Sequence, residues 1–192
     1  MANAEDLEPG ASVEAWLGRL AAGGELATLL ARPPDEQLAK GYAHTLREIA
    51  QQPVTWLETV GRVVADLPVI EATLDEAGVR QGQGALVLTG SGSSLYVGEC
   101  LALPLQQALR VPVTAVAAGQ ILTHPDASVP PQGSYAVVSL ARSGNSPESA
   151  AALDLLLSDS RASHLILTCN GEGALATRYR ARPRVRTLVL VE

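Results

Sequence analysis

The stretch that decides the fold is YAVVSLARSGNSPESAAALDLLL, residues 135–157. It opens with an apolar run, Tyr135–Leu140, that hardly alternates with polar residues, which is typical of a strand buried on both faces. Residues 143–146 are Ser-Gly-Asn-Ser, residue types that are favoured in turns and at helix N-caps. Pro147 then opens an apolar segment, and proline is favoured in the first turn of a helix. The stretch therefore predicts a buried strand, a polar turn and a helix.

The same pattern recurs on both sides of this stretch. Short apolar runs predict five strands, at Ala85–Thr89, Val111–Ala117, Tyr135–Leu140, His164–Thr168 and Val185–Val191. Helices are predicted between most of them, at Ser93–Leu109, Pro147–Leu157 and Gly173–Arg180. Strands that alternate with helices in this way form parallel sheets with right-handed crossovers. We therefore expect an α/β fold with three layers, a doubly wound five-stranded parallel sheet with helices on both faces.

The segment 1–80 is predicted to be helical, and residues 81–192 are predicted to form the α/β domain. Ser12 is expected to cap a first helix, and prolines are expected to open three more, at Pro33-Pro34, Pro53 and Pro68. The link from Gly119 to Gly133 contains three prolines and is predicted to be a loop with at most one turn of helix. The apolar N-terminal helices favour self-association, so we expect a homo-oligomer.

The composition limits the possible partners. The net charge is −6, which argues against nucleic acid or an acidic membrane as the main partner. The one basic cluster, Arg178–Arg186, is compatible with RNA binding through Tyr179, but its alternation favours the polar side of an edge strand. Because there is no signal peptide and no apolar run of membrane-spanning length, we predict a cytoplasmic protein.

Cofactor and metal chemistry find little support in the sequence. Lys40 is the single lysine and lies outside any phosphate-binding loop pattern, and the two cysteines and three histidines lack metal-ligand spacing. A dinucleotide site is the natural alternative, because Gly90 and Gly92 begin its fingerprint. However, Leu95 replaces the third glycine and no acidic residue follows the second strand. We therefore expect neither a metal nor a cofactor.

Two serine-rich turns mark a candidate binding site. Thr89–Ser94 follows the first strand and Ala141–Ser149 follows the third, and each leads into a helix. Ligands of parallel sheets bind at the carboxyl ends of the strands, and helix N-termini offer free N–H groups to anions. With the serine hydroxyls as added donors, the pair predicts a site for a phosphate monoester. Glu148 would repel a phosphate, so its side chain is expected to point away. Ordinary capped turns are the alternative, since these residues favour turns in any protein.

Three segments resemble a known family. Gly90-Ser-Gly-Ser-Ser, Ala141-Arg-Ser-Gly-Asn-Ser-Pro-Glu-Ser and Thr168-Cys-Asn, each at the end of a strand, are similar to the sugar isomerase (SIS) domain. Within that group the second segment most resembles the bacterial tagatose-6-phosphate ketose/aldose isomerases, also described as galactosamine-6-phosphate deaminases. The resemblance covers roughly residues 35–192 and implies a flavodoxin-like strand order and the binding of a hexose 6-phosphate.

The resemblance also implies which residues bind the ligand. Ser94, Ser143 and Ser146 match positions whose hydroxyls hold the phosphate, and Ser93 matches a position close to the sugar. The remaining candidates lie in the same turns or border the same crevice: Ser91, Gly92, Asn145 and Asn170. Ala141 departs from the family pattern Ser-x-Ser-Gly, so one hydroxyl is lost. Arg142 is the candidate to replace it, because a guanidinium is well suited to phosphate; a salt bridge elsewhere is its alternative role.

The catalytic residues are not located by the sequence. Relatives of this type carry two SIS domains, and their glutamate base lies beyond the first. This chain stops at the end of the fifth predicted strand, so we expect the N-terminal half of an isomerase or deaminase that binds sugar phosphate without turnover. Glu99, one helical turn after the first serine turn, is a minor candidate for a base. A non-catalytic sugar-phosphate sensor and a dimerisation module remain open as alternatives.

Overall fold

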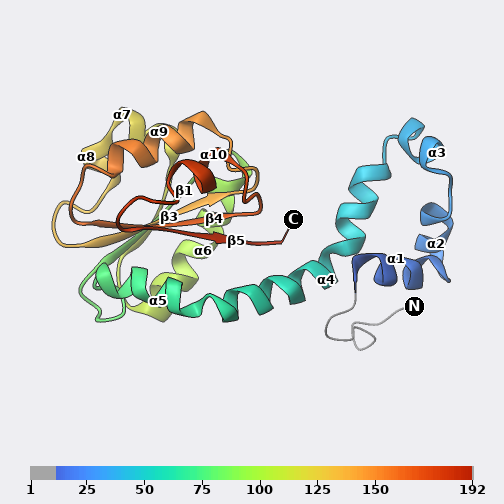
Figure 1. The fold of residues 1–192 in the computed structure, drawn as a ribbon, viewed down its shortest axis with the longest axis horizontal. Helices are drawn as coiled ribbons and strands as arrows, with labels where there is room; N and C mark the ends of the chain where they lie inside the picture. The colour runs from blue at the N-terminus through green and yellow to red at the C-terminus, as the bar shows by residue number, and fades with distance from the viewer. Residues whose placement is uncertain (1–11, 192) are drawn as a thin grey trace. The chain divides into compact units, whose positions relative to one another are not determined.

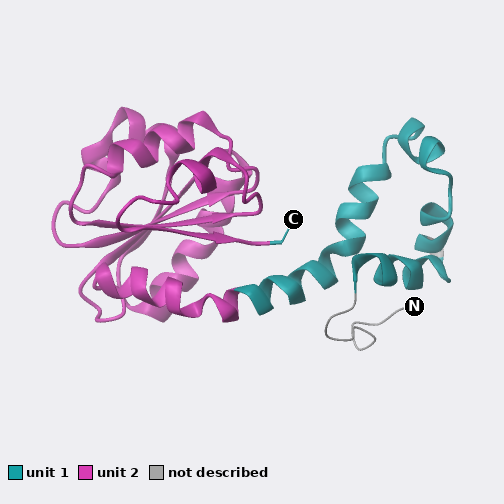
Figure 2. Cartoon of the chain, in the orientation of Figure 1, with its two compact units in different colours: residues 1–62, 191 teal, residues 63–190, 192 magenta. Residues whose placement is uncertain are grey.

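The computed structural model describes residues 12–191. The chain divides into two compact units between Arg62 and Val63 (Figure 2). Among the described residues, the regular elements of the first unit are all helices. The second contains the whole sheet together with the helices that cover it.

The N-terminal unit contains α1 (Val13–Ala21), α2 (Glu25–Leu30), α3 (Pro34–Ala39) and most of α4 (Ala43–Ala65). Ser12 caps α1 as expected, and its Oγ accepts a hydrogen bond of 3.2 Å from the backbone N–H of Ala15. The helix that begins at Pro34 ends early, and Gly41 after it has a φ of +74°, which favours glycine. The short helix α2 was not predicted.

Pro53 does not start a helix, which corrects the sequence prediction. It lies inside α4, although an internal proline removes one hydrogen bond of the ladder. Packing compensates for that loss. Val54 and Ala50 are buried beside the proline, and the indole nitrogen of Trp16 donates a 2.8 Å hydrogen bond to the carbonyl of Ala50. The burial of this face therefore holds α4 together across the proline.

The second unit has the predicted sheet. Its strands are β1 (Ala85–Gly90), β2 (Val113–Ala117), β3 (Tyr135–Ala141), β4 (Ala162–Thr168) and β5 (Val185–Val189). All neighbouring pairs are parallel, and the order is β2-β1-β3-β4-β5, so the flavodoxin-like order is confirmed. The helices are α5 (Leu67–Glu76), α6 (Ser93–Leu109), α7 (Ala118–Thr123), α8 (Pro125–Ser128), α9 (Pro147–Leu156) and α10 (Ala174–Arg178).

The helices form two layers around the sheet. Figure 1 shows α5 and α6 on one face of the sheet and α7 to α10 on the other. The inner strands face both layers, which explains their unalternated apolar sequences: Val87 and Val137 belong to a core cluster with Ile121 of α7, whereas Leu88 belongs to one with Leu105 of α6. The three-layer α/β prediction is therefore confirmed.

Two local predictions are wrong. The segment 119–133 was predicted as a loop, but it contains α7 and α8; Ala118 and Ile121 are completely buried, and α7 packs on α9. His164 is the first residue of the predicted strand His164–Thr168, but β4 begins at Ala162, and His164 lies between β3 and β5 and is only 1% exposed. In both cases the structure depends on tertiary packing, which cannot be read from a single sequence.

Candidate functional site

The first turn runs from Gly90, at the end of β1, to Ser93, at the start of α6. A Cβ atom on Gly90 would lie 2.8 Å from the Cβ of Ser94 and 3.0 Å from the carbonyl oxygen of Leu140, so only glycine fits here. Gly92, at the N-cap, has a φ of +58° and no side chain with which to cap the helix. The chain can therefore turn tightly, and the start of α6 lies directly against the end of β3.

The second turn links β3 to α9. Ser146 is the N-cap of α9, as expected, and its Oγ accepts a 3.3 Å hydrogen bond from the backbone N–H of Ser149. Gly144 has a φ of +66°, and its carbonyl accepts a hydrogen bond from the N–H of Leu175. Because β1 and β3 are neighbours in the sheet, the two serine-rich turns meet at the same edge.

The two turns enclose a pocket of about 200 Å³. Its lining residues are Ser91, Ser93, Ser94, Leu140, Ala141, Arg142, Ser143, Gly144, Ser146 and Ser149. Typical ligand pockets have volumes of roughly 300–1,000 Å³, so this one suits a phosphate group better than a whole sugar phosphate. Of the residues predicted from the sequence, Gly92, Asn145 and Asn170 do not line it.

Hydroxyl groups from both turns meet inside this pocket. Ser91 Oγ lies 3.2 Å from Ser149 Oγ and 3.3 Å from Ser146 Oγ. Ser149 was not among the site residues predicted from the sequence. Its position three residues after the N-cap could have identified it as a site residue, because side chains at this position are directed back toward the helix start.

Glu148, whose side chain was expected to point away from a phosphate, is exposed and does not line the pocket, but its carboxylate lies next to Ser146, which does. Its Oε2 accepts a 2.8 Å hydrogen bond from the hydroxyl of Ser146. A hydrogen bond from its own backbone N–H, together with the one from Ser146, holds the pKa of the Glu148 carboxyl below its usual range. The group is therefore a carboxylate near neutral pH, and it occupies the start of α9.

Asn145 and Asn170 connect the second turn to the next one. Asn145 Oδ1 accepts a 3.0 Å hydrogen bond from the N–H of Ala174, the first residue of α10. Asn170 Nδ2 donates a 3.1 Å hydrogen bond to the carbonyl of Ser143, and Asn170 Oδ1 accepts one from the N–H of Glu172. Both side chains thus brace the turns in this structure, and direct contact with a ligand stays a prediction for them.

Arg142 supplies the positive charge of the pocket. Among the described residues that line it, Arg142 is the one with a charged side chain, and it is exposed. Its carbonyl accepts hydrogen bonds from the Thr168 hydroxyl at 3.2 Å and from the N–H of Cys169 at 3.1 Å. The end of β4 therefore fixes the backbone from which the guanidinium extends.

The other sequence candidates lie outside the pocket. Glu99 is exposed and does not line it. Tyr179 is 1% exposed and its hydroxyl bonds to Asp154 and to the carbonyl of Ala150, both at 2.9 Å, so its ring is not available to stack on a base.

Within residues 12–191 no group of three His, Cys, Asp or Glu side chains is placed to hold a metal ion. Over the same part of the chain, no helix is long and apolar enough to cross a membrane.

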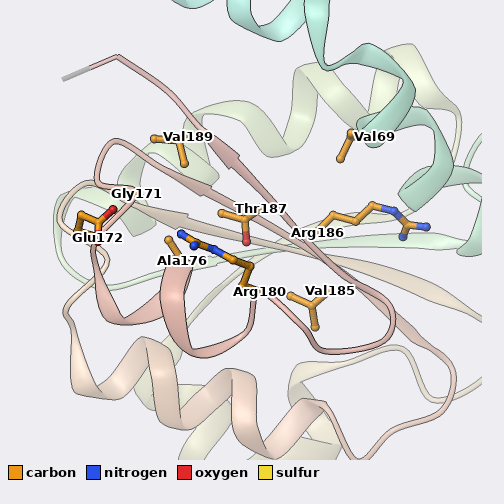
Figure 3. A pocket seen from close by; sticks show the side chains of 9 residues that line it. All are labelled: Val69, Gly171, Glu172, Ala176, Arg180, Val185, Arg186, Thr187 and Val189. Atoms are coloured by element: carbon orange, nitrogen blue, oxygen red, sulfur yellow. The ribbon is translucent and has the colours of Figure 1, made fainter.

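A second pocket, of about 430 Å³, lies along β5 at the edge of the sheet (Figure 3). Arg180 and Arg186 both line it, and two guanidinium groups at one pocket could attract an anion. Arg186, however, forms a bidentate ion pair with Glu76, and the hydrogen bonds from Arg186 hold the pKa of the Glu76 carboxyl below its usual range. The serine-rich pocket, with its converging hydroxyls, therefore remains the better candidate.

Comparison with known proteins identifies the domain. No family model matches the chain. However, the chain is 39% identical over 150 residues to the Streptomyces coelicolor protein named "Putative D-galactosamine-6-phosphate deaminase AgaS", and 38% identical over 148 residues to D-galactosamine-6-phosphate deaminase AgaS of Shewanella sp.. The crystal structure of tagatose-6-phosphate ketose/aldose isomerase from Escherichia coli superposes on 76% of the chain with a TM-score of 0.69 and 28% identity.

The chain contains an SIS domain. The resemblance stated from the three turn segments is thereby confirmed, as is its closeness to the tagatose-6-phosphate isomerases and galactosamine-6-phosphate deaminases. The matches cover 77% and 73% of the chain but only 38% and 37% of the two deaminases, and 40% of the isomerase structure. The chain thus spans about two fifths of the length of these relatives.

Proposed function

We propose that the SIS domain binds a hexose 6-phosphate, with the phosphate held between Ser91–Ser94 and Ser143–Ser146. The protein would act as the sugar-phosphate-binding part of an isomerase or deaminase for galactosamine 6-phosphate or tagatose 6-phosphate. The observation that supports this most directly is the meeting of two hydroxyl-rich helix starts at the ends of neighbouring strands. The names of the similar proteins support the same class of ligand.

The chemistry of the pocket suits a phosphate dianion. Helix N-termini carry a partial positive charge and unpaired N–H groups, and both α6 and α9 begin at this pocket. The serine hydroxyls add neutral donors, and Arg142 adds a guanidinium, which can bind phosphate through two parallel hydrogen bonds. Because the pocket is small, the sugar would extend from it toward the solvent-exposed side.

The pocket is suited to holding a ligand rather than to moving protons. Aldose–ketose isomerisation needs a base near the second carbon of the sugar. The serines here have no imidazole beside them among the lining residues, and the nearest carboxylate, Glu148, is hydrogen-bonded to Ser146. We therefore propose that the base comes from outside this pocket. We also propose a homo-oligomeric, cytoplasmic protein, as the sequence suggested.

Replacement of Ser143 and Ser146 by alanine tests the proposed site. A hydrogen bond to a charged group contributes about 1.5–3 kcal/mol, so each replacement should weaken the binding of galactosamine 6-phosphate or tagatose 6-phosphate by roughly 10- to 100-fold in calorimetry. Ser158→Ala is the matched control, because this serine lies beyond the other end of α9 and bonds only to the carbonyl of Leu155 among the described residues. It should leave the affinity unchanged.

Stability must be measured alongside binding, because Ser146 also caps α9. Loss of an N-cap costs about 1 kcal/mol, so the double variant should still fold, which circular dichroism checks. Threonine at both positions keeps the hydroxyls and should restore most of the affinity. An unchanged dissociation constant in a folded double-alanine variant would show that the phosphate does not bind between these turns.

A further inference from the structure

The two helix starts at the pocket differ in one respect. At α6 the N-cap is Gly92, which has no side chain that could reach the N-terminal N–H groups. At α9 a carboxylate is already in place: Glu148 accepts hydrogen bonds from the Ser146 hydroxyl and from its own backbone N–H. These donors at the start of α9 are the kind that a phosphate oxygen would use. At the pocket, therefore, one helix start has no side-chain cap and the other has a carboxylate beside its capping serine.

The position of one proton decides what Ser146 offers to a ligand. A serine hydroxyl has a single proton to donate. Ser146 Oγ lies 2.8 Å from the Glu148 carboxylate and 3.3 Å from Ser91 Oγ, and it accepts a 3.3 Å bond from the N–H of Ser149. The carboxylate contact is the shortest and is charge-assisted, so it takes the proton. Ser146 thus presents lone pairs to the pocket until its hydroxyl turns away from Glu148.

We propose that Glu148 is an internal competitor of the phosphate and lowers the affinity of the pocket for dianions. This inference rests on the proposed function, because it assigns a role in that same site. When a phosphate binds, Ser146 donates to it, and the carboxylate loses its partner beside a second negative charge. The loss of this charge-assisted hydrogen bond, together with the repulsion between the two nearby negative charges, weakens binding about five- to twentyfold. Glu148 therefore weakens the binding of dianions, and it acts through Ser146.

The test is Glu148→Gln in the full chain. Glutamine has the same shape and can still accept from Ser146, but it carries no charge. We expect inorganic phosphate and sulfate to bind about five- to twentyfold more tightly to this variant at pH 7.5 and low salt, measured by calorimetry. Sulfate is included because it keeps its two charges throughout. Asp126→Asn, which removes an exposed carboxylate from α8, is the control and should change the affinity by less than about twofold.

A double-mutant cycle separates competition for the hydroxyl from simple charge repulsion. In a Ser146→Ala background the gain from Glu148→Gln should shrink to about threefold or less, because no hydroxyl remains to be released. A Ser146→Thr background keeps the hydroxyl and should keep the full gain. An equal gain in all three backgrounds would show that Glu148 acts as a bulk charge, and the proposed route through Ser146 would be wrong.

The remaining outcomes distinguish this inference from the proposed function. If the native chain binds phosphate and loses affinity in Ser143→Ala and Ser146→Ala, but Glu148→Gln binds no more tightly, then the competition proposal alone fails. If neither the native chain nor Glu148→Gln binds phosphate or a hexose 6-phosphate, both proposals fail, because the site itself is then absent.

Discussion

Acidification should destabilise the SIS domain through one buried side chain, His164 of β4. The imidazole is 1% exposed, and neither of its ring nitrogens has a hydrogen-bond partner among the described residues. Burial, reinforced by the positive charge of Arg184, lowers the pKa of His164 from 6.5 to about 4, while Asp159 acts in the opposite direction. The folded state therefore resists protonation at a pH where the unfolded chain accepts a proton.

The sign and size of the effect follow from this difference. Above pH 6.5 His164 is neutral in both states and does not alter the free energy of unfolding. As the pH falls from 6.5 to 4, the unfolded state binds a proton that the folded state does not, so stability is lost at about 1.4 kcal/mol per pH unit. Over the whole window the loss is about 3 kcal/mol, a large fraction of the stability of a typical domain.

The assay compares the native chain with His164→Leu and His164→Gln between pH 7.5 and 4.5. Both tryptophans, Trp16 and Trp56, lie in the N-terminal unit, so their fluorescence would not report on the SIS domain. Denaturant unfolding is better followed by far-ultraviolet circular dichroism, with amide exchange of β3 and β4 as a local measure. The native chain should lose stability below pH 6.5 much faster than His164→Leu, whereas His44→Gln, on the exposed side of α4, should follow the native curve.

A direct titration decides whether the reasoning is correct. The ring protons of His164 can be followed by NMR in the folded chain, and His164→Gln covers the case in which the leucine variant does not fold. A midpoint near 6.5 for His164 would refute the argument, since the buried imidazole would then carry its charge as easily as a solvated one. Parallel stability curves for the native chain and both variants would refute it as well.

Two further predictions concern the ligand. Arg142→Lys should weaken binding of a hexose 6-phosphate by roughly three- to tenfold in calorimetry, because an ammonium cannot make the planar two-bond contact; equal affinity would indicate that Arg142 acts only as a point charge. The 192-residue chain should convert galactosamine 6-phosphate or tagatose 6-phosphate at a rate about 10²–10⁴-fold below that of an enzyme with a positioned base, as followed by NMR. Robust turnover that Glu99→Gln abolishes would instead identify Glu99 as the base.

The sequence predicted the sheet well because buried parallel strands have a simple signature. Unalternated runs such as Leu86–Leu88 are needed wherever both faces of a strand are covered, so the five strands and their parallel pairing could be foreseen. The helix boundaries were harder. Pro53 is a strong local signal for a helix start, but the packing of Trp16 against Ala50 overrides it. Such long-range contacts leave no trace in local composition.

The candidate site, too, could be predicted from the sequence only in part. Strand-end position and residue type were enough to predict that the two serine-rich turns meet at one pocket, whereas Ser94, Ser143 and Ser146 were singled out by the family resemblance. The hydrogen bond from the Ser146 hydroxyl to Glu148 could not be foreseen, because the repulsion between a carboxylate and a phosphate does not show which hydroxyl lies beside the carboxylate. Asn145 bonds to a residue 29 positions away, a pairing that no local pattern could show.

The bracing by Asn145 and Asn170 has a thermodynamic consequence for ligand capture. The second turn is tied to α10 and to the loop after β4 by hydrogen bonds within the protein. Gly173 allows this closeness, since a Cβ atom there would overlap the carbonyl oxygen of Ser143. In the proposed site, residues 143–146 would thus be ordered before a phosphate binds, and little conformational entropy would be left to lose on binding. A loosened turn could keep every serine and still bind poorly, so the affinity of the proposed site would depend on these bracing hydrogen bonds as well as on the serine hydroxyls.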